Sequence, residues 1–159
     1  MLRQFRFVVA GIAIILANLA ASSAVSASMT QAALPVGTTR YAVASATTTV
    51  LNGSKSFKDM AGLVTSISIP AGKHGDVMVT FCASVFSGLG VYAQVLVGGL
   101  VATPGPMPFP ANDLSYCLSF YKVGIAAGIQ SVRVQWRVGP GIGSASASAR
   151  DMIVTVNIR

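Results

Sequence analysis

The feature that most constrains the fold of this chain is an alternation of apolar and polar residues with a period of two. Within residues 131–138 the apolar positions are Val132, Val134, Trp136 and Val138. Successive side chains of an extended strand point to opposite faces, so this segment has one apolar face and one polar face. A slip of one residue would move the apolar set into water, so the pattern fixes both the buried face and the register.

The same alternation recurs at residues 63–69, 77–86, 91–97, 114–123 and 152–158. In the last of these segments Ile153 departs from the pattern. Helical periodicity is hard to find after residue 28. The chain is therefore expected to be all-β, with strands that each bury one face.

Glycine, proline and asparagine mark the expected breaks between strands. We expect a type I′ hairpin turn at Asn52-Gly53 and a tight hairpin at Gly98-Gly99. A turn is expected at residues 71–76, a short connector at residues 124–128, and a loop beginning at residue 139. Four prolines within residues 103–110 predict an extended surface loop, because proline has no backbone N–H to donate.

About eight short strands separated by turn signals indicate a two-sheet antiparallel β-sandwich of jelly-roll type. An immunoglobulin-like sandwich is the alternative. The sandwich is expected to occupy residues 40–159, after a flexible leader at residues 28–39.

Residues 1–27 have the three parts of a cleavable signal peptide. A basic start with Arg3 and Arg6 precedes an apolar run at residues 7–21, and small residues follow at 25–27. The apolar run is shorter than the ~20 residues that a membrane-spanning helix needs. We therefore expect a protein that is exported, either secreted or periplasmic, and whose mature form does not span the membrane.

The charge of the chain does not favour nucleic-acid binding. Removal of the signal peptide, with Arg3 and Arg6, lowers the formal net charge from +7 to +5. The remaining basic residues are scattered, and no run of them could follow a phosphate backbone. We expect no nucleic-acid partner.

The two cysteines, Cys82 and Cys117, both fall on the more polar face of their strands. Two cysteines in an oxidising compartment usually pair, which predicts a Cys82–Cys117 disulfide. The alternative is two small buried thiols on strands that are not neighbours. Both interpretations give the cysteines a structural role.

Side chains for acid–base chemistry are scarce. His74 is the only histidine, and the four acidic residues are all aspartate. These numbers predict a protein that is not an enzyme and that has no metal site and no cofactor. One alternative is a small secreted hydrolase that uses His74 with Asp76 and a loop serine.

The aromatic residues suggest where a ligand could bind. Trp136 lies on the valine face of its strand and is expected in the core. Tyr92 and Tyr121 have the outward parity, and with His74 they are the candidate ligand-binding residues.

Several stretches together carry a resemblance to a known type of domain. These are residues 57–63, 67–72, 92–99 and 128–137, and the final Arg-Asp-x-x-Val-x-Val pattern at residues 150–156. Their order resembles that of uncharacterised secreted bacterial β-sandwich domains, similar in layout to the C1q/TNF-like jelly roll. The resemblance covers residues 55–159 and implies binding or assembly, with a homotrimer as the expected oligomer.

These observations together favour a secreted, non-catalytic β-sandwich. We expect it to bind a glycan or a cell-surface protein, or to assemble with its own copies. An envelope or pilus-type structural subunit is a further alternative.

Overall fold

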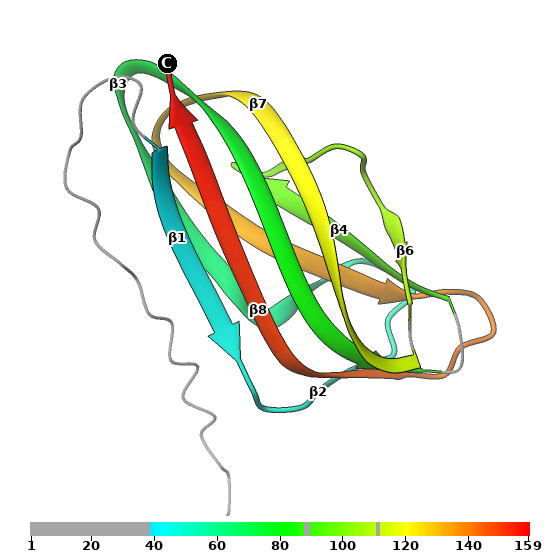
Figure 1. Cartoon of the computed structure of the whole chain (residues 1–159). Coiled ribbons are helices and arrows are strands. Elements are labelled where there is room, and N and C mark those ends of the chain that lie inside the picture. The colour runs from blue at the N-terminus through cyan, green and yellow to red at the C-terminus, as the bar shows by residue number, and fades with distance from the viewer. Residues whose placement is uncertain (1–38, 88–89, 111) are drawn as a thin grey trace, which may run out of the picture.

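The computed structural model describes residues 39–87, 90–110 and 112–159 (Figure 1). The predicted signal peptide and all of the predicted leader except Thr39 lie outside these residues. The regular elements within the described ranges are all β-strands. None of these ranges contains a helix that is long and apolar enough to cross a membrane.

Eight strands make up the fold, and every pair of neighbours is antiparallel. They are β1 (Thr39–Ala46), β2 (Val50–Asn52), β3 (Lys58–Phe86), β4 (Val91–Val97), β5 (Leu100–Val101), β6 (Met107–Phe109), β7 (Asn112–Val138) and β8 (Ala145–Ile158). The hydrogen-bonded order is β1-β8-β3-β7-β4-β5, with β2 on β8 and β6 on β4.

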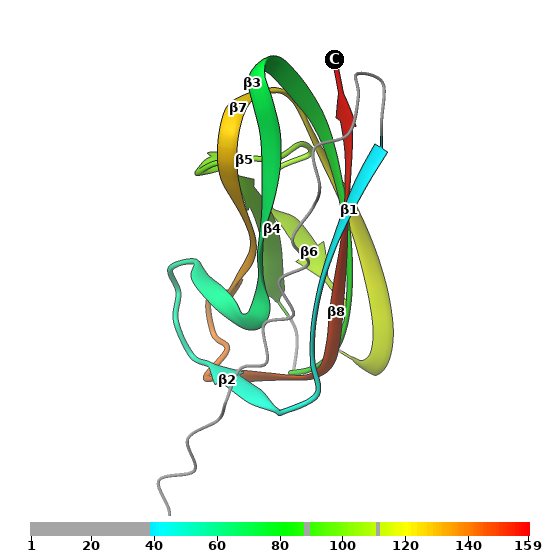
Figure 2. The ribbon, with the colours of Figure 1, turned by 90° about the vertical axis from the view of Figure 1, so that its left-hand side faces the viewer.

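The sheet folds over on itself because β3 and β7 are long and bend together. Layer 1 consists of β1, β8, residues 77–86 of β3 and residues 112–122 of β7. Layer 2 consists of residues 58–69 of β3, residues 125–138 of β7, and β4 with its short neighbours β5 and β6. Figure 2 views the two layers from the side. The predicted all-β antiparallel fold is confirmed, and its two layers, compatible with a sandwich, belong to one hydrogen-bonded sheet of eight strands.

The predictions of a turn at residues 71–76 and a connector at residues 124–128 were wrong. Both segments lie inside strands, at the bends where β3 and β7 pass from one layer to the other. Pairing continues through the bend at His74 and Ala126, with register shifts on either side. Glycine occurs at these positions because it tolerates the backbone conformation of a bent strand as well as that of a chain-reversing turn.

The predicted type I′ hairpin at Asn52-Gly53 was also wrong, because β2 pairs with β8 and not with the strand that follows it. The Asn52 side chain is buried. Its Nδ2 donates to the Trp136 carbonyl over 2.9 Å, and its Oδ1 accepts from the Ser54 N–H over 2.8 Å. The Asn52 side chain therefore forms an Asx-turn with the backbone two residues later. Asn-Gly sequences occur in such turns as well as in hairpins.

Replacing Asn52 with alanine should lower the free energy of unfolding by about 1–3 kcal/mol, because the buried Trp136 carbonyl loses its donor. Urea denaturation followed by Trp136 fluorescence measures the change. Leu51→Ala is the control, since Leu51 is 77 % exposed and its replacement should change stability by less than about 0.5 kcal/mol. Equal stability of the two variants would contradict the assignment.

The hairpin at Gly98-Gly99 is confirmed between β4 and β5, with φ angles of 58° and 81° at the two glycines. The loop predicted for residues 103–110 is wrong at Met107–Phe109, which forms β6. Among the described strands it pairs with β4 alone, and a proline fits such an edge position.

The core lies between the two layers and contains the predicted apolar faces. The buried sets include Val132, Val134, Trp136 and Val138 from β7, Val77, Val79, Phe81, Ala83 and Val85 from β3, and Met152, Val154, Val156 and Ile158 from β8. The Phe81 ring stacks on Phe109 and Phe120 at centroid distances of 5.6 and 6.0 Å. The predicted exception, Ile153, is exposed.

Candidate binding face

The outward side chains of layer 1 form rows that run across all four strands. The strand register aligns three of them. The first row is Tyr41, Thr155, Met78 and Tyr121, the second is Val43, Ile153, Thr80 and Ser119, and the third is Ser45, Asp151, Cys82 and Cys117. Because no described element packs on this side of layer 1 in Figures 1 and 2, the rows form its outer face.

Large apolar side chains on this face remain open to solvent. Tyr41, Met78 and Tyr121 are 58 %, 52 % and 54 % exposed, and Val43 and Ile153 are exposed as well. Single exposed apolar residues are ordinary, whereas a contiguous group of them on one face indicates an interaction surface.

The outer face of layer 1 carries little charge. Asp151 is the one ionisable acid or base other than tyrosine in the three rows, all of whose residues are described. At the end of the face the Asp76 carboxylate forms an ion pair with Arg159. The positive charge of the chain therefore lies elsewhere.

The outer face of layer 2 carries a group of polar side chains that bind one another. Gln94 donates to Gln135 over 2.9 Å, and Gln135 donates to Asp59 over 2.7 Å. Arg133 lies 3.4 Å from the same carboxylate. Layer 2 exposes apolar side chains as well, among them Val64, Leu100, Val101 and Ile129, but charged and amide groups lie among them. The rows of layer 1 differ in having almost no charge beside their exposed apolar side chains.

The two candidate tyrosines lie in different layers and are not brought together. Tyr121 is in the first row of layer 1, whereas Tyr92 pairs with Arg137 in layer 2. The Arg137 guanidinium lies over the Tyr92 ring at 4.6 Å and over the Phe57 ring at 5.3 Å. Tyr92 is thus engaged in a cation–π contact within its own layer.

His74, the third candidate, lies at the bend of β3. Its backbone N–H and C=O exchange hydrogen bonds with those of Arg159, over 3.0 and 2.8 Å. One oxygen of Asp76 accepts from the Gly124 N–H over 3.0 Å, and the other pairs with Arg159. Both carboxylate oxygens therefore hold the bend and the C-terminal strand together.

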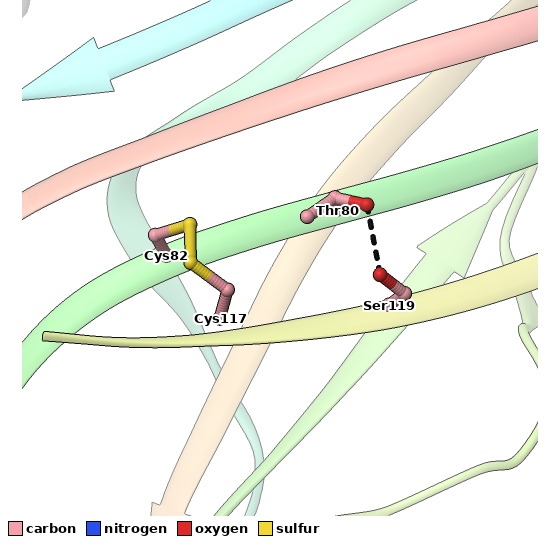
Figure 3. Close-up of a disulfide and its surroundings, with 4 residues drawn as sticks. All are labelled: Thr80, Cys82, Cys117 and Ser119. Carbon is pink, nitrogen blue, oxygen red and sulfur yellow. Dashed lines mark hydrogen bonds between the residues drawn. A yellow bond between two sulfur atoms is a disulfide. The ribbon is translucent and has the colours of Figure 1, made fainter.

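The Cys82–Cys117 disulfide is confirmed and lies in the third row (Figure 3). The two cysteines are directly opposite across β3 and β7, with their Cα atoms 4.0 Å apart. Two residues away, the hydroxyls of Thr80 and Ser119 are hydrogen-bonded over 2.8 Å. The disulfide and this hydrogen bond join the first half of β7 to β3.

Sequence reasoning missed two buried arginines at the opposite side of the sandwich, where β1 and residues 58–69 of β3 are edges. Arg40 is 3 % exposed, and its Nη1 donates to the Ser68 carbonyl over 2.8 Å. Its Nε and Nη2 are buried without a hydrogen-bond partner.

Arg150, also 3 % exposed, makes more contacts. Its Nε donates to the Ala61 carbonyl over 3.1 Å, and its Nη1 donates to the carbonyls of Thr48 and Ala147, each over 2.7 Å. Burial lowers the pKa of Arg150 from its ordinary value by desolvating the charge. The alternation of the strands could have indicated this burial, because each arginine lies on the same face of its strand as the buried apolar residues.

Within the part of the chain that the structure describes, no group of three or more His, Cys, Asp or Glu could hold a metal ion. No protein-family model matches the chain, and no curated protein matches it in sequence.

Proposed function

We propose that this protein is an exported, non-catalytic binding module that uses the outer face of layer 1. The observation that carries the proposal is the near absence of charge among the exposed apolar side chains of this face. The chain has a net charge of +7, yet the three rows hold exposed tyrosine, methionine, valine and isoleucine with a single aspartate.

The composition of the face favours an uncharged, extended ligand such as a neutral polysaccharide of a cell exterior. Tyr41 and Tyr121 are three strand spacings apart in one row, which is about 14 Å. Tyrosine offers an apolar ring with a polar tip, and hydroxyls add hydrogen-bonding groups, that of Thr155 within this row and those of Thr80 and Ser119 in the next. A polyanion would find no lysine or arginine in the rows.

A hydrolase that uses His74 and Asp76 has less support. A general base needs an orienting partner within hydrogen-bonding distance. The contacts of the Asp76 carboxylate go to Gly124 and Arg159 and not to His74.

A pilus-type subunit that receives a donated strand gains no support from the edges formed by β1 and by residues 58–69 of β3. Such a subunit exposes its core where a strand is missing. Here the inward residues of both edges on the arginine side, such as Ala42, Ala44, Leu63 and Ile67, are 0–5 % exposed.

Binding to insoluble neutral polysaccharides, chitin and cellulose, tests the proposed function. The mature protein should be depleted from solution by at least one of them, and Tyr121→Ala and Tyr41→Ala should each weaken binding by about tenfold. Tyr92→Ala is the matched control on the other layer and should bind as the original protein does. Equal binding by Tyr121→Ala and Tyr92→Ala, or no binding to either polymer, would count against the proposed face and ligand.

A further inference from the structure

The first half of β7 is an edge of layer 1, and the hydrogen-bond pattern shows which of its backbone groups point outward. His74 and Arg159 form a reciprocal hydrogen-bonded pair. Because such pairs recur at every second residue, the even-numbered residues of β3 bond to β8 and the odd-numbered ones bond to β7. On β7 the even-numbered residues therefore bond to β3, and Ser115, Cys117 and Ser119 direct their N–H and C=O groups toward the open edge.

Two observations support this assignment. Tyr121, the next odd-numbered residue, exchanges two hydrogen bonds of 2.9 Å with Thr103 on the edge side. The Cα separation of 4.0 Å between Cys82 and Cys117 suits a pair without mutual backbone hydrogen bonds. The open window thus runs from Ser115 to Ser119, and among described residues no strand pairs with it on that side.

The window lacks the charged residues and prolines that protect many strand edges. Residues 115–119 read Ser-Tyr-Cys-Leu-Ser, without charge, proline or a register shift. The edge formed by residues 58–69 of β3 has a register shift after Asp59, and buried arginines bind two of its carbonyls. An edge strand without such protection is a template for pairing with another chain.

The window is also complementary to itself. A twofold antiparallel pairing centred on Cys117 places Ser115 opposite Ser119 of the second copy, so every outward-pointing backbone group in the window gains a partner. Because Thr103 already pairs with Tyr121, the pairing ends at the window, and the chain of the second copy must leave the edge before its residue 115. The same register places Tyr116 opposite Leu118 of the second copy. Tyr116 is 36 % exposed and Leu118 is half-buried, and an aromatic–aliphatic cross-strand pair would cover both.

We propose that two copies of this chain pair through Ser115–Ser119 of β7, joining their layers 1 into one continuous eight-stranded sheet. The disulfide and the Thr80–Ser119 hydrogen bond already hold the window in strand conformation, so little order is lost on pairing. The contact is short, and its dissociation constant lies in the range of about 10 µM to 1 mM. The dimer doubles the outer face of layer 1 but does not depend on what that face binds.

Sedimentation velocity from about 1 µM to 1 mM tests the dimer. The mature protein should pass from monomer to dimer over this range. Ser115→Lys/Ser119→Lys places two like-charged pairs across the twofold axis and should weaken association by about tenfold or more. Ser115→Glu/Ser119→Glu should be equally monomeric, whereas an equimolar mixture of the two variants should form heterodimers.

The mixture is the internal control, because both variants lose the Thr80–Ser119 hydrogen bond equally. Val43→Lys/Ser45→Lys adds the same charge to the β1 edge and should dimerise as the original protein does. Amide hydrogen exchange gives a second measurement: the N–H groups of Ser115, Cys117 and Ser119 should become protected only at high protein concentration.

A protein that stays monomeric at 1 mM, a trimer, or a dimer that survives Ser115→Lys/Ser119→Lys would overturn the proposal. These outcomes are separate from those for polysaccharide binding, since a dimer that binds no glycan would leave the edge pairing intact and remove only the proposed ligand.

Discussion

Replacing Arg150 with alanine should lower the free energy of unfolding by about 3–5 kcal/mol. The guanidinium supplies the hydrogen-bond donors for three carbonyls, those of Ala61, Thr48 and Ala147, at a position that is 3 % exposed. Alanine removes the guanidinium donors from these carbonyls in a region of low dielectric, where a lost hydrogen bond costs the most. Urea denaturation followed by circular dichroism measures the loss.

Arg40 provides the comparison for this prediction. It is equally buried but donates to the Ser68 carbonyl alone, and two of its nitrogens have no partner. Arg40→Met should therefore cost about 1 kcal/mol or less, since losing one hydrogen bond is offset by removing two unsatisfied donors. If Arg40→Met destabilised the protein as much as Arg150→Ala, burial of the charge and not the number of carbonyl contacts would set the effect.

The arginines also mark a limit of sequence reasoning. Alternation with a period of two identified the buried faces of residues 77–86, 91–97, 131–138 and 152–158, because the pattern of apolar residues is visible within each strand's own sequence. The same alternation places Arg40 and Arg150 inside. A charged side chain is not expected in a core, however, and burial is tolerated here because the guanidinium groups donate to backbone carbonyls. Those carbonyls belong to segments far away in the sequence, which the local pattern does not specify.

The bends were misassigned for a related reason. Glycine at Gly72 and Gly124 has a positive φ of 74° and 67°, which a local reading cannot distinguish from a chain reversal. The difference lies in pairing: His74 remains opposite Ala126, so β3 and β7 turn the corner together. That information is long-range.

The candidate face could be predicted in part. Parity alone placed Tyr121 on an outer surface and the two cysteines beside it. It could not place Tyr41 or Met78 in the same row, because the row depends on the register of four strands that are far apart in sequence. Parity likewise could not separate Tyr92 from Tyr121, since both point outward from different layers.

Removing the disulfide with Cys82→Ala/Cys117→Ala should lower the free energy of unfolding by about 3–4 kcal/mol. The bond joins residues 35 apart in sequence, and the effect follows from the larger number of conformations open to an unfolded chain without this loop. Cys117 is exposed and Cys82 is half-buried, so the substitutions leave little cavity and the native packing changes little. Urea denaturation of the oxidised protein and the variant gives the difference.

A reductant supplies the control, because dithiothreitol should destabilise the original protein by the same amount and leave the variant unchanged. Thr80→Val/Ser119→Ala removes the neighbouring hydrogen bond and should cost only about 1 kcal/mol, which separates the covalent link from the polar one. A loss below about 1 kcal/mol in the cysteine variant would mean that β3 and β7 stay paired in the unfolded chain. The cysteine variant also tests the proposed pairing through the β7 edge. If the disulfide holds the Ser115–Ser119 window in position for a second copy, this variant should dimerise more weakly while still folded.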